Sequence, residues 1–96
     1  MTLSAYYRKF WRGDSETKQE FVKVRTIEVE NLEEGFYQMQ GEIWSPNGEA
    51  RPLIESLGLS HTSMSVGDVF EDESTGKLYL CEFYSFKEVD TFPTEV

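Results

Sequence analysis

The residue types needed for nucleophilic catalysis occur together in one short stretch, residues 61–68. In Ser-His-Asp hydrolases a serine hydroxyl is activated by an imidazole, which a carboxylate orients. Ser63 or Ser65 would be the nucleophile, His61 the base and Asp68 the orienting acid. Such triads are normally assembled from distant segments, and neighbours on an extended stretch point to alternate sides. We therefore expect no triad here, and we expect the hydroxyl groups to satisfy loop backbone groups locally.

Other signatures of cofactor or metal chemistry are lacking. His61 is the only histidine and Cys81 the only cysteine, so the chain cannot assemble a multi-histidine site, a cysteine zinc site or an internal disulfide. The acidic residues among 68–73 carry oxygen ligands suited to a hard cation, but their spacing lacks the order of an EF-hand loop. No phosphate-binding glycine loop, dinucleotide fingerprint or zinc-protease helix occurs. We predict a non-enzymatic protein with no cofactor or metal, and with Cys81 as a buried, inert thiol.

A partner-binding patch is the remaining candidate site. Loops often carry function, and Trp and Arg are favoured at protein interfaces. The alternative is that Trp44 only anchors a helix and that Arg51 pairs with a nearby glutamate. The residues predicted to contact a partner are Trp44, Asn47, Arg51, His61, Ser63, Ser65 and Asp68.

The charge of the chain narrows the class of partner. Eighteen acidic residues against nine basic ones give a net charge of −9, which disfavours direct binding to nucleic acid. Between Thr26 and Ala50 there are six glutamates and no basic residue. This stretch is either a solvated face that keeps the protein soluble, or an acidic surface that binds a basic partner or imitates nucleic acid.

The N-terminal half predicts a hairpin followed by helices. Residues 3–11 are aromatic-rich and residues 21–30 rich in β-branched side chains, so we predict two strands joined by a turn at 13–17. Asn31 and Glu34 form a capping box before apolar residues at helical spacing. The alternation within residues 37–43 also fits a strand, but the cap favours a helix over 31–43. After the turn at 45–48, we predict a short helix over 49–57.

The C-terminal half predicts a second hairpin, with strands over 63–70 and 77–88 and a turn at 72–76. Residues 78–84 are apolar on both alternations, which is typical of a central strand covered on both faces. Residues 90–96 are predicted to form a loose tail. The expected fold is a single α+β domain over residues 1–96, an antiparallel sheet of about four strands with one or two helices packed on one face.

The chain lacks the signals of membrane insertion or export. No apolar run approaches the roughly 20 residues that span a bilayer, and the N-terminus has no signal-peptide core. We expect a cytoplasmic protein that does not enter a membrane. Its oligomeric state is open, because an aromatic strand at a sheet edge could also pair between chains.

Three segments, residues 39–42, 44–51 and 61–69, resemble small uncharacterised proteins of phages, plasmids and bacterial chromosomes. The second half is similar to the YodL-like domain, which pairs a Ser-x-Ser-Val-Gly-Asp-Val stretch with a later strand ending in Gly-Phe-Lys. The resemblance covers roughly residues 32–89, and Ser85 stands where that pattern has Gly. It implies an accessory protein of a mobile element that acts through protein–protein contacts. The alternatives are an acidic nucleic-acid mimic that inhibits a host defence protein of the restriction type, and a small hydrolase that uses His61.

Overall fold

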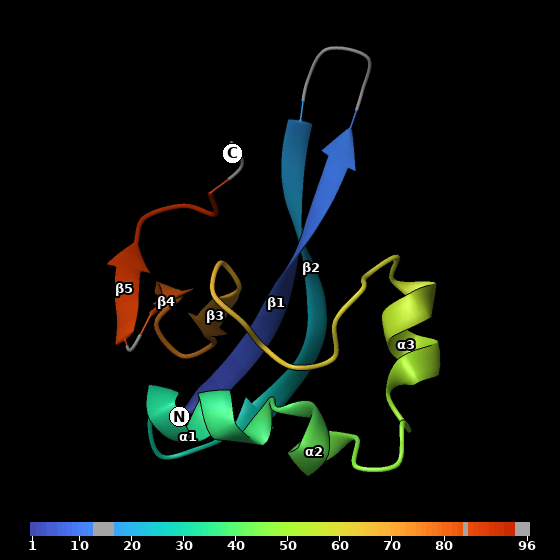
Figure 1. Cartoon of the computed structure of the whole chain (residues 1–96). Helices are drawn as coiled ribbons and strands as arrows, with labels where there is room; N and C mark the ends of the chain where they lie inside the picture. Colours follow the sequence, from blue (N-terminus) through green and yellow to red (C-terminus); the bar gives the residue numbers. More distant parts are fainter. Residues whose placement is uncertain (13–16, 84, 94–96) are drawn as a thin grey trace.

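The computed structural model describes residues 1–12, 17–83 and 85–93, with the backbone alone for residues 10–12 and 17–19. Its described strands form one antiparallel sheet in the order β2-β1-β3-β4-β5 (Figure 1). Short helices lie beside this sheet, so the predicted α+β class is confirmed. The sheet has five strands where about four were expected.

The N-terminal hairpin is formed by β1 (Thr2–Arg12) and β2 (Thr17–Glu28), as predicted from the aromatic and β-branched side chains. The turn predicted at 13–17 lies outside the described residues except for Thr17. A register shift next to Ala5 and Tyr6 bends the pair, as a β-bulge does. Alternate side chains of β1, among them Leu3, Ala5 and Tyr7, are fully buried and supply one wall of the core.

The predicted helix over 31–43 is present but divided into α1 (Leu32–Gln38) and α2 (Gly41–Trp44). Asn31 caps α1 by accepting a hydrogen bond from the Glu34 backbone N–H at 2.8 Å. The helix stops at Met39 because the carbonyl oxygen of Met39 is used by distant donors. The backbone N–H of Met64 donates to it at 3.1 Å. A tertiary contact therefore breaks a helix that local signals would continue.

The turn and helix that follow agree with the sequence. Gly48 has a φ of 83°, which glycine adopts without steric cost, so the chain reverses at the predicted turn. The helix α3 (Arg51–Ser56) lies within the predicted range of 49–57 and has Pro52 in its first turn. Within the described residues, no helix is both long and apolar enough to cross a membrane.

The C-terminal half differs from the expectation in two ways. Residues 63–67 form a loop, so the first strand of the hairpin is β3 (Val69–Asp72) and not 63–70. The prediction of a single strand over 77–88 was wrong. This segment forms two strands, β4 (Leu78–Glu82) and β5 (Ser85–Val89), and the chain reverses between them so that Glu82 pairs with Ser85. This reversal supplies the fifth strand and places β5 at the edge of the sheet.

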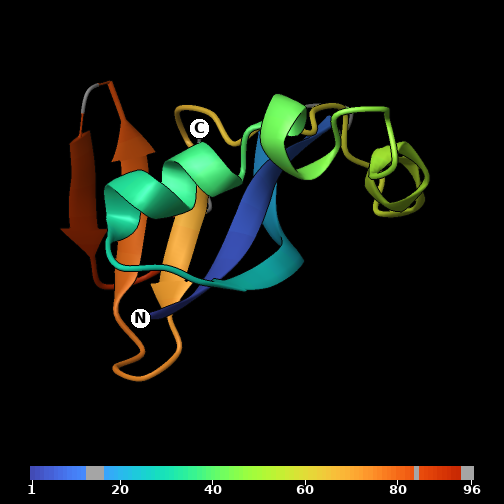
Figure 2. The same cartoon turned by 90° about the horizontal axis from the view of Figure 1, so that it is seen from below.

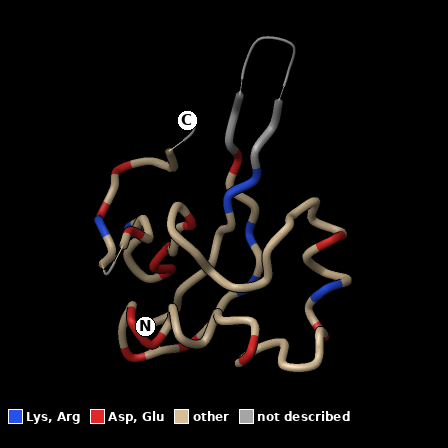
Figure 3. The backbone as a smooth tube through the Cα atoms, viewed as in Figure 1, with Lys and Arg blue, Asp and Glu red and all other residues tan. Residues whose placement is uncertain are grey.

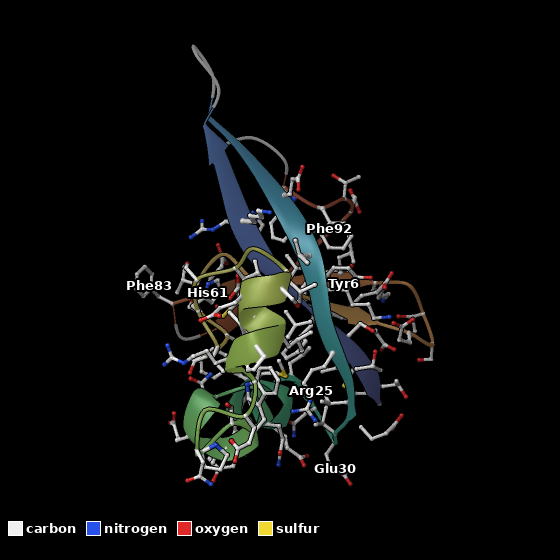
Figure 4. All side chains as sticks on the ribbon, turned by 90° about the vertical axis from the view of Figure 1, so that its right-hand side faces the viewer. Tyr6, Arg25, Glu30, His61, Phe83 and Phe92 are labelled. Carbon is white, nitrogen blue, oxygen red and sulfur yellow. The ribbon has the colours of Figure 1, made fainter. Side chains whose placement is uncertain are left out.

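Different segments cover the two faces of the sheet. Figure 2 shows α1 crossing β3 and β4, with β5 at the margin beyond the helix. The core lies beneath the helices and contains Tyr7, Met39, Met64 and Phe70, each at most 2% exposed. Phe92 packs on the opposite face, with its ring centroid 4.9 Å from that of Tyr6 (Figure 4). The predicted tail is thus packed at least as far as Phe92.

Candidate functional site

Asp68 has a buried carboxylate that contacts His61, which is partly buried, and Ser65, which is exposed. We call these three residues, all singled out for catalysis, the Asp68 cluster. Asp68 lies between the turn at Gly67 and the start of β3, and only 1% of its side chain is exposed. Its Oδ1 accepts a hydrogen bond from the Arg8 backbone N–H at 2.8 Å. Its Oδ2 accepts one from the Ser65 backbone N–H at 2.9 Å and lies 2.9 Å from His61 Nε2. The carboxylate therefore joins the 61–68 loop to β1 just before β3 begins.

The His61 imidazole is contacted on its ring face as well as at its Nε2 atom. Its ring stacks on that of Tyr7, with centroids 4.7 Å apart and planes inclined by 13°. The Tyr7 hydroxyl donates to the carbonyl oxygen of Thr62 at 2.6 Å. Burial, followed by the negative charge of Asp68, raises the pKa of Tyr7 well above its ordinary value. Tyr7 is therefore a neutral hydrogen-bond donor that holds the loop in place.

These contacts do not form a serine hydrolase triad. His61 and Asp68 do converge, contrary to our expectation for neighbours in sequence, because the loop bends at Gly67, whose φ is 97°. The Ser65 hydroxyl, however, points to Asp68 at 3.4 Å, and the Ser63 hydroxyl accepts from the Gly41 backbone N–H at 2.7 Å. Among the described residues, no serine hydroxyl is hydrogen-bonded to the imidazole. The hydroxyl groups were expected to satisfy nearby loop backbone groups, but the Ser63 hydroxyl binds a backbone N–H of α2, far away in sequence, and the Ser65 hydroxyl binds the Asp68 carboxylate.

The other members of the predicted patch lie elsewhere. Trp44 is half-buried, and its indole N–H donates to the carbonyl oxygens of Met39 at 3.1 Å and Thr62 at 3.2 Å. These bonds fit the alternative in which Trp44 is an anchor. Asn47 is exposed and bonds Glu49, whose carboxylate accepts from the Asn47 backbone N–H at 2.9 Å and from its amide group.

Arg51 is exposed at the start of α3, and in the part of the chain that the structure describes it makes no ion pair. The pairing with a glutamate proposed for Arg51 is therefore not found there. The seven predicted residues do not form one surface. His61, Ser65 and Asp68 are joined in the Asp68 cluster. Trp44, Asn47 and Arg51 lie on or between α2 and α3, and Ser63 lies in the 61–68 loop against α2.

The polar chemistry of the described residues is internally satisfied. Each buried side-chain nitrogen and oxygen among them has a hydrogen-bond partner. Within the same residues, no group of three histidine, cysteine, aspartate or glutamate side chains could hold a metal ion. Cys81 is buried as predicted, and its burial raises its pKa to about 11. The Asp68 cluster is therefore suited to holding the loop.

An apolar groove that sequence reasoning missed lies between α1 and the last two strands. Its volume is about 440 Å³. We call it the α1–β5 groove. The helix contributes Leu32, Glu33 and Phe36, and the strands contribute Cys81, Glu82, Ser85 and Phe86. Two of these lining residues, Phe36 and Phe86, meet edge to face at a ring-centroid distance of 6.4 Å.

Phe83, in the turn between β4 and β5, is next to this groove in sequence and is 76% exposed. Its side chain extends away from the body on the side opposite Tyr6 and Phe92 (Figure 4). Phe83 is present in the sequence, but the prediction of one continuous strand over residues 77–88 gave no reason to place it in a turn.

Charge is distributed unevenly over the molecule. Figure 3 shows basic residues along the β1–β2 hairpin and acidic residues around the beginning of α1. Glu28, Glu30 and Glu33 are exposed there. The acidic stretch recognised in the sequence thus borders the α1–β5 groove through Glu33.

Comparison of the chain with models of protein families, with curated proteins and with solved structures finds no match.

Proposed function

We propose that the protein is a non-enzymatic accessory protein that acts through protein–protein contacts in the cytoplasm of a bacterial host. The α1–β5 groove is the observation that carries the proposal. It combines aromatic side chains with the carboxylates of Glu33 and Glu82, and the next residue after Glu82 is the exposed Phe83. Exposed apolar surface with a polar rim is typical of interaction sites. The resemblance to proteins of phages and plasmids supports an accessory role in a mobile element.

The arrangement of the polar residues also supports a role in contact. Asp68 accepts bonds from two backbone N–H groups, a duty that fixes its position in the fold. Ser63 and Trp44 are likewise engaged with backbone groups. A catalytic group needs a free edge directed at substrate. These side chains instead hold the loop that packs beside the sheet.

An acidic nucleic-acid mimic is the second candidate, and the exposed glutamates around the beginning of α1 favour it. Such a mimic would bind the basic groove of a host defence protein. Its affinity would fall steeply with ionic strength and DNA would compete with it. Contacts made mainly in the apolar groove would be much less sensitive to salt.

The test is capture of a partner from the native host, followed by reconstitution. The tagged protein is used at two salt concentrations, and captured proteins are identified by mass spectrometry. The proposal predicts a protein that then binds the purified chain with defined stoichiometry and that DNA does not displace. Failure to bind any captured protein after purification would reject the proposal. Displacement of the partner by DNA, together with a steep loss of affinity as the salt concentration rises, would favour the nucleic-acid mimic.

A further inference from the structure

The outer edge of β5 opens directly beside the α1–β5 groove. Within the described part of the chain, β5 pairs with β4 and has no strand on its other side. An unpaired edge presents backbone N–H and C=O groups that an added strand can bind. By alternation, Phe86 faces α1 with Cys81, its pairing partner. A strand added to β5 would therefore direct every second side chain toward the groove.

The charge at this position selects the kind of strand. Glu33 and Glu82 line the groove and are both exposed, and none of the described lining residues is basic. Lys87, the basic residue of β5, is exposed and does not line the groove. A second copy added through its own β5 would present Glu88, which by alternation shares the face of Phe86, to this acidic groove. The groove is thus better matched to a basic segment of another protein.

We propose that a partner protein adds an extended segment of about five residues to the edge of β5. The segment places an apolar side chain in the α1–β5 groove and has Lys or Arg two residues to either side, near Glu33 and Glu82. The inference rests on the proposed function and specifies its contact. Main-chain bonds to β5 supply affinity, and the apolar and basic side chains supply selectivity. Five residues is the length of β5.

A synthetic peptide, acetyl-Lys-Thr-Ile-Thr-Lys-amide, provides the probe. Its first, third and fifth side chains lie on one face of a strand, as the groove requires. We expect binding with a Kd of about 1 mM or tighter, with amide chemical-shift changes in β5 and α1 on NMR titration. A peptide with glutamate in place of both lysines should not bind. Versions N-methylated at alternate residues, in both phases, test the backbone contribution, and one phase should abolish binding.

Charge reversal in the protein tests the position of the groove. The double variant Glu33→Lys/Glu82→Lys should weaken binding of the basic peptide by about ten-fold or more and allow the glutamate peptide to bind. The matched control is Glu42→Lys/Glu55→Lys, which changes the net charge equally at exposed positions outside the groove. The control should alter the Kd less than about three-fold. Equal urea midpoints would show that both variants fold alike.

The outcomes separate this inference from the proposed function. Shifts centred on β2, equal effects of the two double variants, or no binding of the peptide would overturn the site. A concentration-dependent dimer in which the β5 amides are protected from hydrogen exchange would also overturn the proposed site, because it would show that the protein self-associates through β5. A partner captured from the host that binds both double variants equally would retain the proposed function and reject the groove. Peptide binding at β5 with no captured partner would retain the groove as a binding site and reject the proposed function.

Discussion

Replacement of Asp68 by alanine should strongly destabilise the fold. The side chain is 1% exposed and is the acceptor for the backbone N–H groups of Arg8 and Ser65. Alanine would leave both donors without a partner in the folded chain. Hydrogen bonds to a charged group contribute about 1.5–3 kcal/mol each, so the two together predict a loss of about 3–6 kcal/mol. This is a large part of the roughly 5–15 kcal/mol that stabilises a typical domain.

Urea unfolding followed by circular dichroism measures the effect. With a slope of about 1.5 kcal/mol per M, the midpoint should fall by about 2–4 M. Asp68→Asn should lose less, about 1–3 kcal/mol, because the amide oxygen retains one of the two acceptors. The control Asp90→Ala removes an exposed aspartate and should change stability by no more than about 0.5 kcal/mol. If Asp68→Ala resembles this control, the carboxylate does not hold the loop to β1.

Three further changes test other parts of the fold. Cys81, with its pKa raised to about 11, should react with a disulfide reagent at pH 8 at least about 100-fold more slowly than the urea-unfolded chain, and equal rates would show that it is accessible. Trp44→Phe keeps an aromatic ring but removes the indole N–H that donates to two carbonyl oxygens, so the free energy of unfolding should fall by about 1 kcal/mol. An unchanged urea midpoint would argue against Trp44 as an anchor. Hydrogen bonds from Ser74 lower the pKa of Asp72, so this carboxylate stabilises the fold above its ordinary pKa and that contribution is lost as pH falls. Ser74→Ala should raise the Asp72 pKa in an NMR titration, and an unmoved value would contradict the stated cause.

Local signals in the sequence were sufficient for the hairpin and the helix starts. Asn31 and Glu34 specify a cap through short-range bonds, and Gly48 specifies a reversal through its own backbone. The end of α1 was different. Met39 stops the helix because its carbonyl oxygen binds donors from β1 and from the 61–68 loop. No pattern within residues 31–43 could reveal partners that far along the chain.

The reversal after Glu82 was also beyond sequence patterns. Residues 83 and 84 lack the Gly, Pro, Asn or Asp that usually marks a turn, and the apolar residues from Leu78 onward favour one continuous strand. The groove depends on this reversal because Phe86 is brought back beside Cys81. For the same reason the candidate surface could not be predicted, although the exposed Phe83 was present in the sequence.

The convergence of His61 with Asp68 has a similar explanation. His61 and Asp68 are seven positions apart, and in an extended chain their side chains would not meet. The bend at Gly67 and the bond from the Arg8 N–H, which belongs to a strand far away in sequence, bring the two side chains together. Sequence spacing identified residues that matter to the loop, but their role became visible only with β1 in place.

Hydrogen exchange of the β5 amides tests the central claim most directly. The exchange rates of Ser85–Val89 are measured for the protein alone and with the partner captured from the host, and the β2 amides serve as the internal reference. Strand addition predicts that alternate amides of β5 become about ten-fold or more slower to exchange on binding, while those of β2 do not change. Unchanged exchange throughout β5 in a saturated complex would contradict the account.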